Sequence, residues 1–270
     1  MSNEEISRNK PNLEQEHQVL QELIKNFSQN DLENVLKKGS EFLSLLPTSF
    51  KLWNILGAAH PQLRNLKDAL SCYTKAIKLN PNYAEAHNNL GNLFKIQGEL
   101  EKAITSYYKA LEIKPNLYDA SYNLGIIYQQ KENFNLAKEK YFLTLETKSD
   151  HIGAYLNLGI LYRQERNFKS SLLNLEKAEE LDPFSAEIKN RLGNTLKDQG
   201  NYDAAIENFE KAISLDPKFA KAMNNIGNAY MDIDKTDEAL TNYKKAIETD
   251  PNFAEAYHNL SKVVKFSSFS

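Results

Sequence analysis

A proline recurs at a fixed interval of 34 residues through most of the chain, and this spacing constrains the fold more than any other feature. Six of the eight prolines follow it, and Ser149 fills the one gap in the series Pro47, Pro81, Pro115, Pro183, Pro217 and Pro251. A glycine lies ten residues after each point of the series except the last, at Gly57, Gly91, Gly125, Gly159, Gly193 and Gly227. The proline spacing and the glycine spacing are both kept over many copies. This regularity indicates one short structural unit repeated along the chain.

Each copy also keeps one pattern of large and small residues. Numbered from the third residue after the proline, position 7 is leucine or isoleucine and positions 20 and 27 are small, while position 24 is bulky: Tyr73, Tyr107, Tyr141, Leu175, Phe209 and Tyr243. Positions 4, 7, 8 and 11 share one face of a first helix, and positions 20, 24 and 27 share one face of a second. We therefore predict an all-α fold of antiparallel helix hairpins, in which small residues allow close approach and the bulky residue fills the remaining space.

The first copy carries a recognisable signature, formed by Trp53, Leu56, Gly57, Ala69, Tyr73 and Pro81. This signature resembles that of the tetratricopeptide repeat. The resemblance implies a right-handed superhelical α-solenoid, in which each hairpin packs mainly on its neighbours. It covers six full copies with the boundaries 50–83, 84–117, 118–151, 152–185, 186–219 and 220–253.

The two ends of the chain depart from the repeated pattern. Residues 1–12 are polar, and we expect them to be disordered. Residues 13–47 have apolar residues at helical spacing but lack the small and bulky positions of the repeat, so we predict a divergent capping helix pair. Residues 254–266 supply a single first helix, which is either a capping helix or a truncated seventh repeat. Apolar surface is expected there at Val263, Val264 and Phe266.

Charge and cysteine content exclude several classes of function. The formal net charge is −3 with basic and acidic residues interspersed, so no extended basic stripe is offered to nucleic acid. Cys72 is the one cysteine of the chain, which excludes an intrachain disulfide and a multi-cysteine metal cluster. No stretch approaches the ~20 apolar residues of a membrane span, and the start lacks the apolar run of a signal sequence. We therefore predict a cytoplasmic protein that binds neither membranes nor nucleic acid.

No constellation of residues in the sequence supports catalysis. The histidines fall at different repeat positions without metal-ligand spacing, at His17, His60, His87, His151 and His258. The glycines lie a full repeat apart, unlike those of a phosphate-binding loop. We therefore expect no catalytic residue, no metal and no cofactor, and a chain that is not an enzyme.

The candidate binding residues lie on the first helices, which the family resemblance implies line the inner face of the superhelix. The polar candidates are Asn88, Asn89, Asn92, Asn123, Asn157, Arg191, Asn194, Asn225, Asn228 and Asn259. An asparagine side chain offers one acceptor and two donors, so a column of them can hold the backbone of an extended peptide. The column resembles the asparagine ladder in the repeats of O-linked N-acetylglucosamine transferases. Asparagine is also the commonest choice of the repeat family at these positions, and so inherited consensus is the alternative explanation.

Four apolar residues interrupt this polar lining, namely Tyr122 and Leu156 at position 5 with Ile126 and Ile160 at position 9. Apolar surface rimmed by polar residues is typical of a partner site. The alternative is that these side chains pack into neighbouring helices as core. The carboxylate clamp of the family is not expected. The matching positions hold Asn88, Asn92, Asn123, Gly153 and Asn157, so the two asparagines of the clamp are present but its three basic residues are missing.

Together these patterns predict a non-catalytic scaffold for protein–protein interaction, which binds an extended peptide or a partner helix in its groove. The alternative is the substrate-recognition module of a glycosyl- or sulfotransferase whose catalytic domain is absent from the chain. A third interpretation is self-association through the C-terminal helix, residues 254–266.

Overall fold

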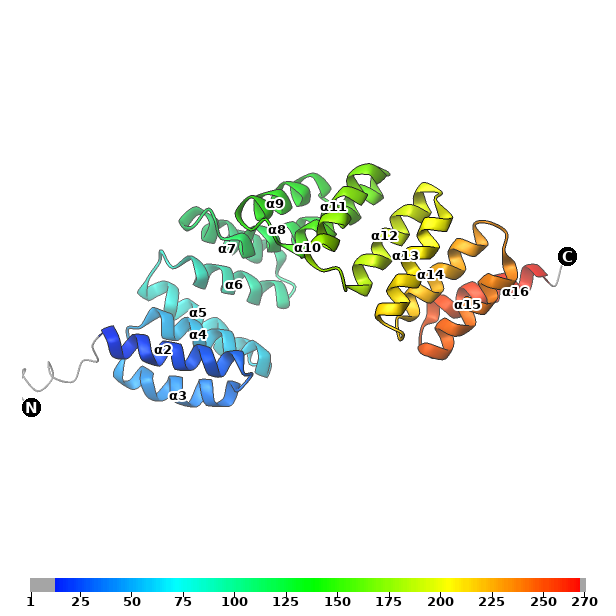
Figure 1. Ribbon diagram of the computed structural model, residues 1–270. Helices are drawn as coiled ribbons and strands as arrows, with labels where there is room; N and C mark the ends of the chain where they lie inside the picture. Colours follow the sequence, from blue (N-terminus) through cyan, green and yellow to red (C-terminus); the bar gives the residue numbers. More distant parts are fainter. Residues whose placement is uncertain (1–12, 268–270) are drawn as a thin grey trace, which may run out of the picture. The chain divides into compact units, whose positions relative to one another are not determined.

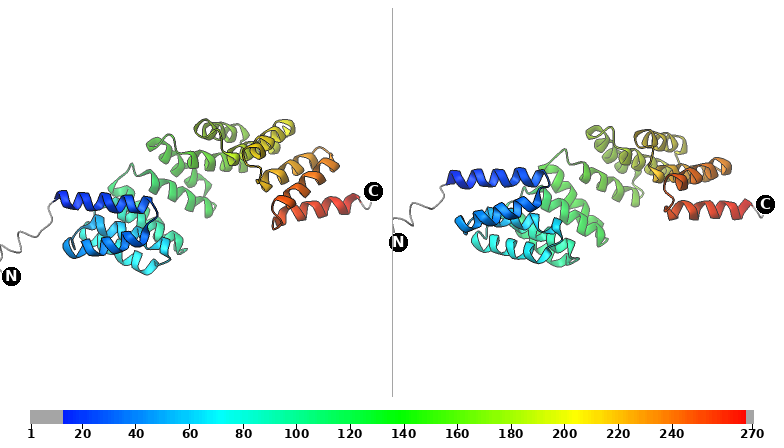
Figure 2. Two further views of the ribbon diagram at one scale, coloured as in Figure 1. Left: turned by 60° about the horizontal axis from the view of Figure 1, so that its bottom comes forward. Right: turned by 90° about the horizontal axis from the view of Figure 1, so that it is seen from below.

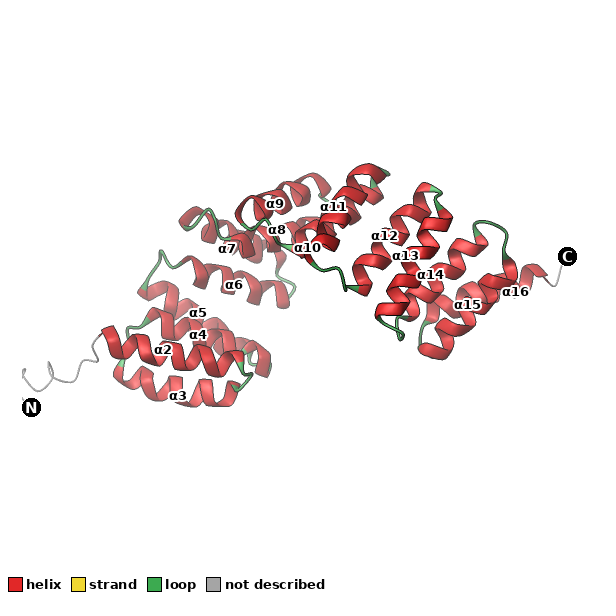
Figure 3. Ribbon diagram, viewed as in Figure 1, coloured by secondary structure: helices red, strands yellow, loops and turns green. Residues whose placement is uncertain are grey.

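The structure is a computed structural model that describes residues 13–267, and the expected disorder of residues 1–12 falls outside this range. The described residues form fifteen α-helices and one short 3₁₀ helix, with no strand among them (Figure 3). Within each of the two units described below, consecutive helices pack on one another. The predicted all-α class is confirmed, and the helix hairpin is its building block.

The chain divides into two compact units, Met1–Thr147 and Lys148–Ser270, which are described separately. The first unit contains α2 (Leu13–Ser28), α3 (Leu32–Leu45), α4 (Phe50–Ala59), η1 (Pro61–Leu63), α5 (Leu66–Leu79), α6 (Ala84–Ile96), α7 (Leu100–Ile113), α8 (Tyr118–Gln130) and α9 (Phe134–Thr147) (Figure 1). The second unit contains α10 (Ile152–Gln164), α11 (Phe168–Leu181), α12 (Ala186–Gln199), α13 (Tyr202–Leu215), α14 (Ala220–Met231), α15 (Thr236–Thr249) and α16 (Ala254–Ser267). None of these helices has the length and apolar character that a membrane crossing requires within the described part of the chain.

The turn inside each pair has one left-handed residue, followed directly by the residue that caps the second helix. Two of these left-handed residues are glycines, Gly98 with φ 77° and Gly200 with φ 90°. The cap is usually asparagine, as at Asn167, whose side-chain oxygen accepts the backbone N–H of Ser170 at 3.1 Å. Such a cap satisfies one of the N–H groups that a helix start leaves unpaired. The turn therefore reverses the chain sharply and begins the second helix at a fixed residue.

The two helices of a pair approach most closely where a glycine faces the bulky residue. A Cβ atom on Gly91 of α6 would lie 2.7 Å from Cε1 of Tyr107 on α7, which is too close for a side chain. Tyr107 is 0% exposed, and its hydroxyl donates to Oδ1 of Asn92 at 2.7 Å. The predicted packing of a small residue against a bulky one is present in this pair.

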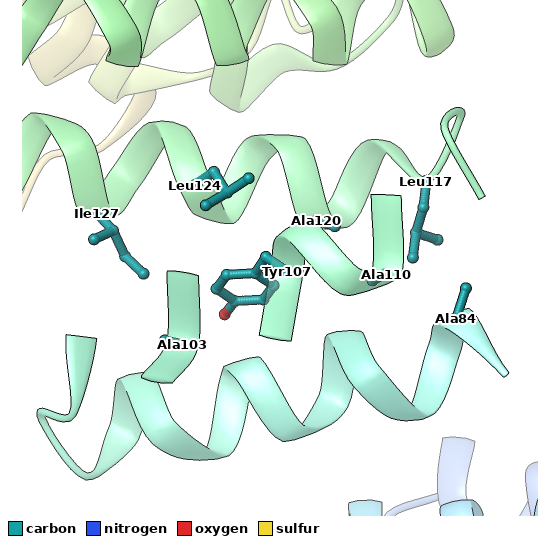
Figure 4. Close-up of a cluster of buried hydrophobic side chains, with 8 residues drawn as sticks. All are labelled: Ala84, Ala103, Tyr107, Ala110, Leu117, Ala120, Leu124 and Ile127. Carbon is teal, nitrogen blue, oxygen red and sulfur yellow. The ribbon is translucent and has the colours of Figure 1, made fainter. Parts of the chain in front are cut away.

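The same ring also holds the next pair in place. Figure 4 shows Tyr107 at the centre of a buried cluster, with Ala103 and Ala110 from its own helix and Leu124 and Ile127 from α8. The buried members of this cluster are Ala84, Ala103, Tyr107, Ala110, Leu117, Ala120, Leu124 and Ile127. The part of this apolar burial that Leu124 and Ile127 supply requires the neighbouring pair to be folded, as expected for a solenoid.

The first helix pair, α2 and α3, covers α4 with a core that includes Leu23, Val35 and Leu52. Here the glycine, Gly39, lies on the second helix of the pair, α3. A Cβ atom on Gly39 would come within 2.4 Å of Cδ2 of Leu56 on α4. The close approach of small to bulky residues is thus kept, but it runs between pairs and not within one. This reversal gives a physical reason for the departure of residues 13–47 from the repeat pattern.

The last helix, α16, packs on α15 and ends the second unit, where the views of Figure 2 place it beside α15. Ala256 is fully buried, and Val263 is only 4% exposed because it packs against Ala239 and Tyr243. The expectation that Val263 would be exposed is therefore wrong. The next residue, Val264, is exposed, whereas the side chain of Phe266 lies outside the described residues.

Candidate functional site

Three of the candidate asparagines tie one first helix to the first helix of the preceding pair. In each case the side-chain Nδ2 donates to an asparagine Oδ1 located 35 residues earlier: Asn89 to Asn54 at 3.0 Å, Asn225 to Asn190 at 2.8 Å, and Asn259 to Asn224 at 3.0 Å. One donor of each candidate is therefore used to join neighbouring pairs. The carbonyl oxygen of the same amide is not used by this bond. The amide of Asn259 also donates to Oδ1 of Asn228 at 3.1 Å. The sequence did not lead us to predict this hydrogen bond between asparagines. The spacing of 35 residues between the two asparagines was the pattern that could have indicated it.

The candidates at position 9 are engaged differently. Asn92 and Asn228 accept hydrogen bonds from the buried tyrosines of their own pairs, with Tyr107 at 2.7 Å and Tyr243 at 2.8 Å. Asn194 has no such donor available, because Phe209 occupies the tyrosine position and carries no hydroxyl group. These bonds orient the amides of Asn92 and Asn228. The amide of Asn194 is not held by a tyrosine in this way.

Asn88 and Asn123 do not form the bridge that their spacing of 35 residues would allow. Asn123 donates to the backbone oxygen of Asp119 at 2.9 Å and accepts a hydrogen bond from Nζ of Lys95. Asn88 is 8% exposed, and its Oδ1 has no hydrogen-bond partner among the described residues. A buried carbonyl oxygen without a partner costs about 1–3 kcal/mol, so Asn88 offers an acceptor that an N–H group of a ligand could satisfy.

The first unit has a cavity of about 340 Å³ beside this free acceptor. It is lined by Leu20, Ile24, Lys51, Asn54, Ile55, Tyr83, Glu85, Asn88, Asn89, Leu117 and Asp119. Two of the predicted residues, Asn88 and Asn89, are brought together here. The contribution of α2 through Leu20 and Ile24 was not predicted, because nothing in the sequence shows how far the first pair reaches over the next.

The second unit has a cavity of about 220 Å³ between its first helices. It is lined by Gly159, Ile160, Arg163, Leu175, Glu187, Asn190, Arg191, Asn194, Thr195, Lys221 and Asn225. Four of the predicted residues, Ile160, Arg191, Asn194 and Asn225, meet in this place. Arg163 and Lys221 were not among the predicted site residues. Their side chains add positive charge to the lining of the cavity.

The four apolar candidates have separate environments. Tyr122 lies on α8 of the first unit with its ring centroid 5.8 Å from that of Tyr141, and Ile126 on the same helix is half-buried. Leu156 on α10 of the second unit packs against a core cluster that contains Leu175 and Ile188. Ile160 lines the cavity of that unit. Tyr122 and Leu156 therefore have core contacts of their own, and a continuous apolar patch across all four residues stays a prediction.

The remaining candidate, Asn157, is half-buried on α10. No group of three or more histidine, cysteine, aspartate or glutamate side chains that could hold a metal ion occurs in the residues the structure describes. Cys72 is buried on α5, and burial raises the pKa of its thiol to about 11. The thiol is therefore protonated near neutral pH, where only the thiolate would be nucleophilic.

His60 follows α4, and its buried Nδ1 has no hydrogen-bond partner among the described residues. Burial lowers the pKa of His60 below 6.5, and the nearby charge of Asp68 opposes this shift. Since the unfolded chain takes up this proton at higher pH, the stability that His60 contributes is full above the unfolded pKa and is lost as pH falls toward the folded pKa.

The unfolding free energy of the wild-type protein should therefore fall between pH 7.5 and pH 5.5. We expect His60→Phe to make this fall smaller in urea titrations. Equal pH dependence in His60→Phe and wild type would contradict the prediction.

Comparisons with known proteins agree with the arrangement of helix pairs. The family model described as TPR repeat matches residues 57–98, 91–132, 193–234 and 227–265, and the model described as tetratricopeptide repeat matches residues 152–185. Together these matches cover more than half of the chain. A comparison with curated protein sequences yields no match.

Several solved structures are similar to the chain. The crystal structure of YrrB, described as a TPR protein with an unusual peptide-binding site, is 30% identical and covers 70% of this chain and 98% of YrrB, with a TM-score of 0.59. A crystal structure of MamA is 28% identical and covers 64% of this chain and 94% of MamA, with a TM-score of 0.56. A tetratricopeptide repeat protein from Parabacteroides merdae is 20% identical over 92% of this chain and 98% of that protein, with a TM-score of 0.64, and supports the fold alone.

Proposed function

The chain belongs to the tetratricopeptide repeat family, and from this premise we propose that it is a non-catalytic scaffold that binds an extended peptide along the first helices of its hairpins. The similarity to YrrB, a protein with a peptide-binding site, supports this choice of ligand. Polar side chains on these helices supply hydrogen-bond groups that can pair with a peptide backbone.

The observation that carries the proposal is the buried Oδ1 of Asn88, which has no partner among the described residues and belongs to the lining of the first unit's cavity. A peptide backbone N–H directed at this oxygen would satisfy an acceptor that folding leaves unpaired. Leu20, Ile24 and Ile55 in the same lining offer apolar contact to a side chain of the peptide. A backbone-directed bond of this kind holds peptides of varied sequence, as a scaffold requires.

The proposal is tested by selecting dodecapeptides from a displayed random library with the full chain and then measuring their affinity by calorimetry. We expect Asn88→Leu to weaken the selected peptides by about five- to tenfold, the equivalent of one net hydrogen bond. The variant should keep or exceed the thermal stability of wild type, because the substitution removes an unpaired buried acceptor. A loss of binding would therefore not be explained by a damaged fold.

Asn208→Leu is the matched control. Asn208 lies on α13, a second helix, and its amide donates to the backbone oxygen of Ala204 at 2.9 Å. This control should bind the selected peptides as wild type does. Selection of no peptide, or equal affinity for wild type and Asn88→Leu, would overturn the proposal.

Three finer statements stay predictions from the sequence. They are the cytoplasmic location, the alternative of a recognition module for a transferase, and self-association through the C-terminal helix. None of them is needed for the peptide-binding proposal or its test.

A further inference from the structure

We infer that the cavity of the second unit recognises an anionic side chain of the bound peptide through Arg163, Arg191 and Lys221. The inference rests on the proposed peptide-binding function and adds the chemistry of one recognised residue. A glutamate or aspartate carboxylate and a phosphorylated side chain share the required chemistry, which is a compact anion with several acceptor oxygens.

The charged residues that line this cavity are mostly cationic. Arg163, Arg191 and Lys221 come from α10, α12 and α14, and Glu187 is the one acidic residue that lines the cavity with them. Nε of Arg163 lies 3.4 Å from Oδ2 of Asp198, which is outside the lining. Lys221 is exposed and forms no ion pair with any described residue. Three cations from separate helices thus share the lining with one carboxylate, and a second carboxylate, Asp198, pairs with Arg163 from outside it.

Arg191 has a donor that the fold leaves unused. Its Nη2 donates to Oε1 of Glu187 at 2.6 Å, one helical turn away, while its Nε is buried without a partner among the described residues. A guanidinium binds carboxylate and phosphate through parallel N–H groups, so an unused Nε–H is the half of that arrangement still available. A buried donor without an acceptor is costly, and an anionic ligand would remove that cost.

The neighbouring pairs explain why Arg191 takes no part in the bridge between first helices. Arg191 occupies the position at which Asn225 and Asn259 bridge to an asparagine located 35 residues earlier. The residue 35 positions before Arg191 is Leu156, which packs into the core and has no acceptor to offer. The bridge between pairs is thus absent at this step within the second unit. The long cationic side chain that replaces asparagine is directed instead to the cavity it lines.

Glu187 competes with the proposed ligand. Its carboxylate occupies Nη2 of Arg191, and its charge opposes an incoming anion in the same cavity. Removal of this charge should therefore strengthen anion binding, whereas removal of Arg191 or Lys221 should weaken it. Opposite effects of neighbouring substitutions are not expected from general damage to the fold.

The test uses the full chain and three pools of fluorescent dodecapeptides, acetylated and amidated at their ends. The central residue is glutamine, glutamate or phosphoserine, and the flanking residues are random but uncharged. By fluorescence anisotropy, we expect the glutamate or phosphoserine pool to bind about tenfold more tightly than the glutamine pool, the effect of a charge-assisted hydrogen bond. The tighter of the two anionic pools identifies the source of the anion, and high salt should reduce the preference.

The preference should be lost in Arg191→Gln, reduced in Lys221→Gln and increased in Glu187→Gln. Lys177→Gln is the matched control, because Lys177 is exposed on α11 and pairs with Glu180 outside the cavity. Lys221 is also exposed, so its variant keeps the test valid even where Arg191→Gln does not fold. Equal binding of all three pools, or a preference that survives both cavity variants, would overturn the inference and leave the proposed function intact. Failure of every pool to bind would overturn both.

Discussion

Tyr107→Ala lowers the free energy of unfolding by about 3–5 kcal/mol, whereas the same change at the adjacent Tyr108 costs less than about 1 kcal/mol. The two residues share one helix, one side-chain type and the same helix propensity. Tyr107 is 0% exposed, and Tyr108 is 40% exposed. Urea denaturation of both variants, followed by circular dichroism, measures the difference directly.

The large cost at Tyr107 has two sources. Loss of the ring empties the centre of the cluster that joins α6, α7 and α8, so Leu124 and Ile127 lose their packing against it. Loss of the hydroxyl also removes the donor to Oδ1 of Asn92. Tyr107→Phe separates the two contributions, because it keeps the ring and should cost only about 1 kcal/mol.

Tyr108 makes weaker contacts on the surface. Its hydroxyl lies 3.0 Å from that of Tyr128, and Nζ of Lys140 lies 5.3 Å from its ring centroid. Contacts of this type at exposed positions contribute about 0.5–1 kcal/mol. Equal destabilisation by Tyr107→Ala and Tyr108→Ala would show that burial at the glycine contact does not dominate the stability of the pair.

The sequence predicted the hairpin fold because the information that specifies it is local. A proline stop, a glycine on the first helix and a bulky residue on the second all lie within one repeat, and the helical period places them on facing surfaces. Gly91 and Tyr107 meet as this reasoning requires. Even the reversed contact of Gly39 with Leu56 follows the same rule, but its direction could not be predicted because it depends on how two pairs stack.

The candidate sites were predictable only in part, since they depend on relations between repeats. The residue type at position 6 identified Asn89 and Asn225, but their bonds to Asn54 and Asn190 depend on the separation of neighbouring first helices. The free Oδ1 of Asn88 arises because its expected partner is bound elsewhere, and no sequence pattern contains that information.

The cationic residues of the cavity in the second unit were also only partly predictable from the sequence. The pairing of Arg191 with Glu187 follows from a spacing of four residues on one helix and could have been expected. The convergence of Arg163 and Lys221 with them requires three successive first helices to be placed in space. The proposed binding chemistry therefore depends on residues about one repeat apart, which a pattern within one helix does not group.

Gly193→Val and Phe209→Ala each destabilise the second unit, yet together they cost less than the sum of the two. A Cβ atom on Gly193 would lie 2.5 Å from Cε1 of Phe209, whose ring is fully buried against Ala205, Ile226 and Ala229. We expect about 3 kcal/mol for Gly193→Val from overpacking, and about 3–5 kcal/mol for Phe209→Ala from the cavity it leaves. Urea denaturation of both single variants and the double variant supplies the complete cycle.

The expected coupling follows from the shared space. In the double variant the valine methyl groups enter the volume that the ring vacated, so the clash disappears and the cavity is partly filled. The cost of the double variant should therefore fall short of the sum by about 1–3 kcal/mol. Gly193→Val combined with Tyr243→Ala is the matched control, because Tyr243 faces Gly227 in the next pair, and those two costs should add. Coupling of equal size in the control cycle would mean that the interaction spreads through the whole unit and does not arise from one glycine facing one ring.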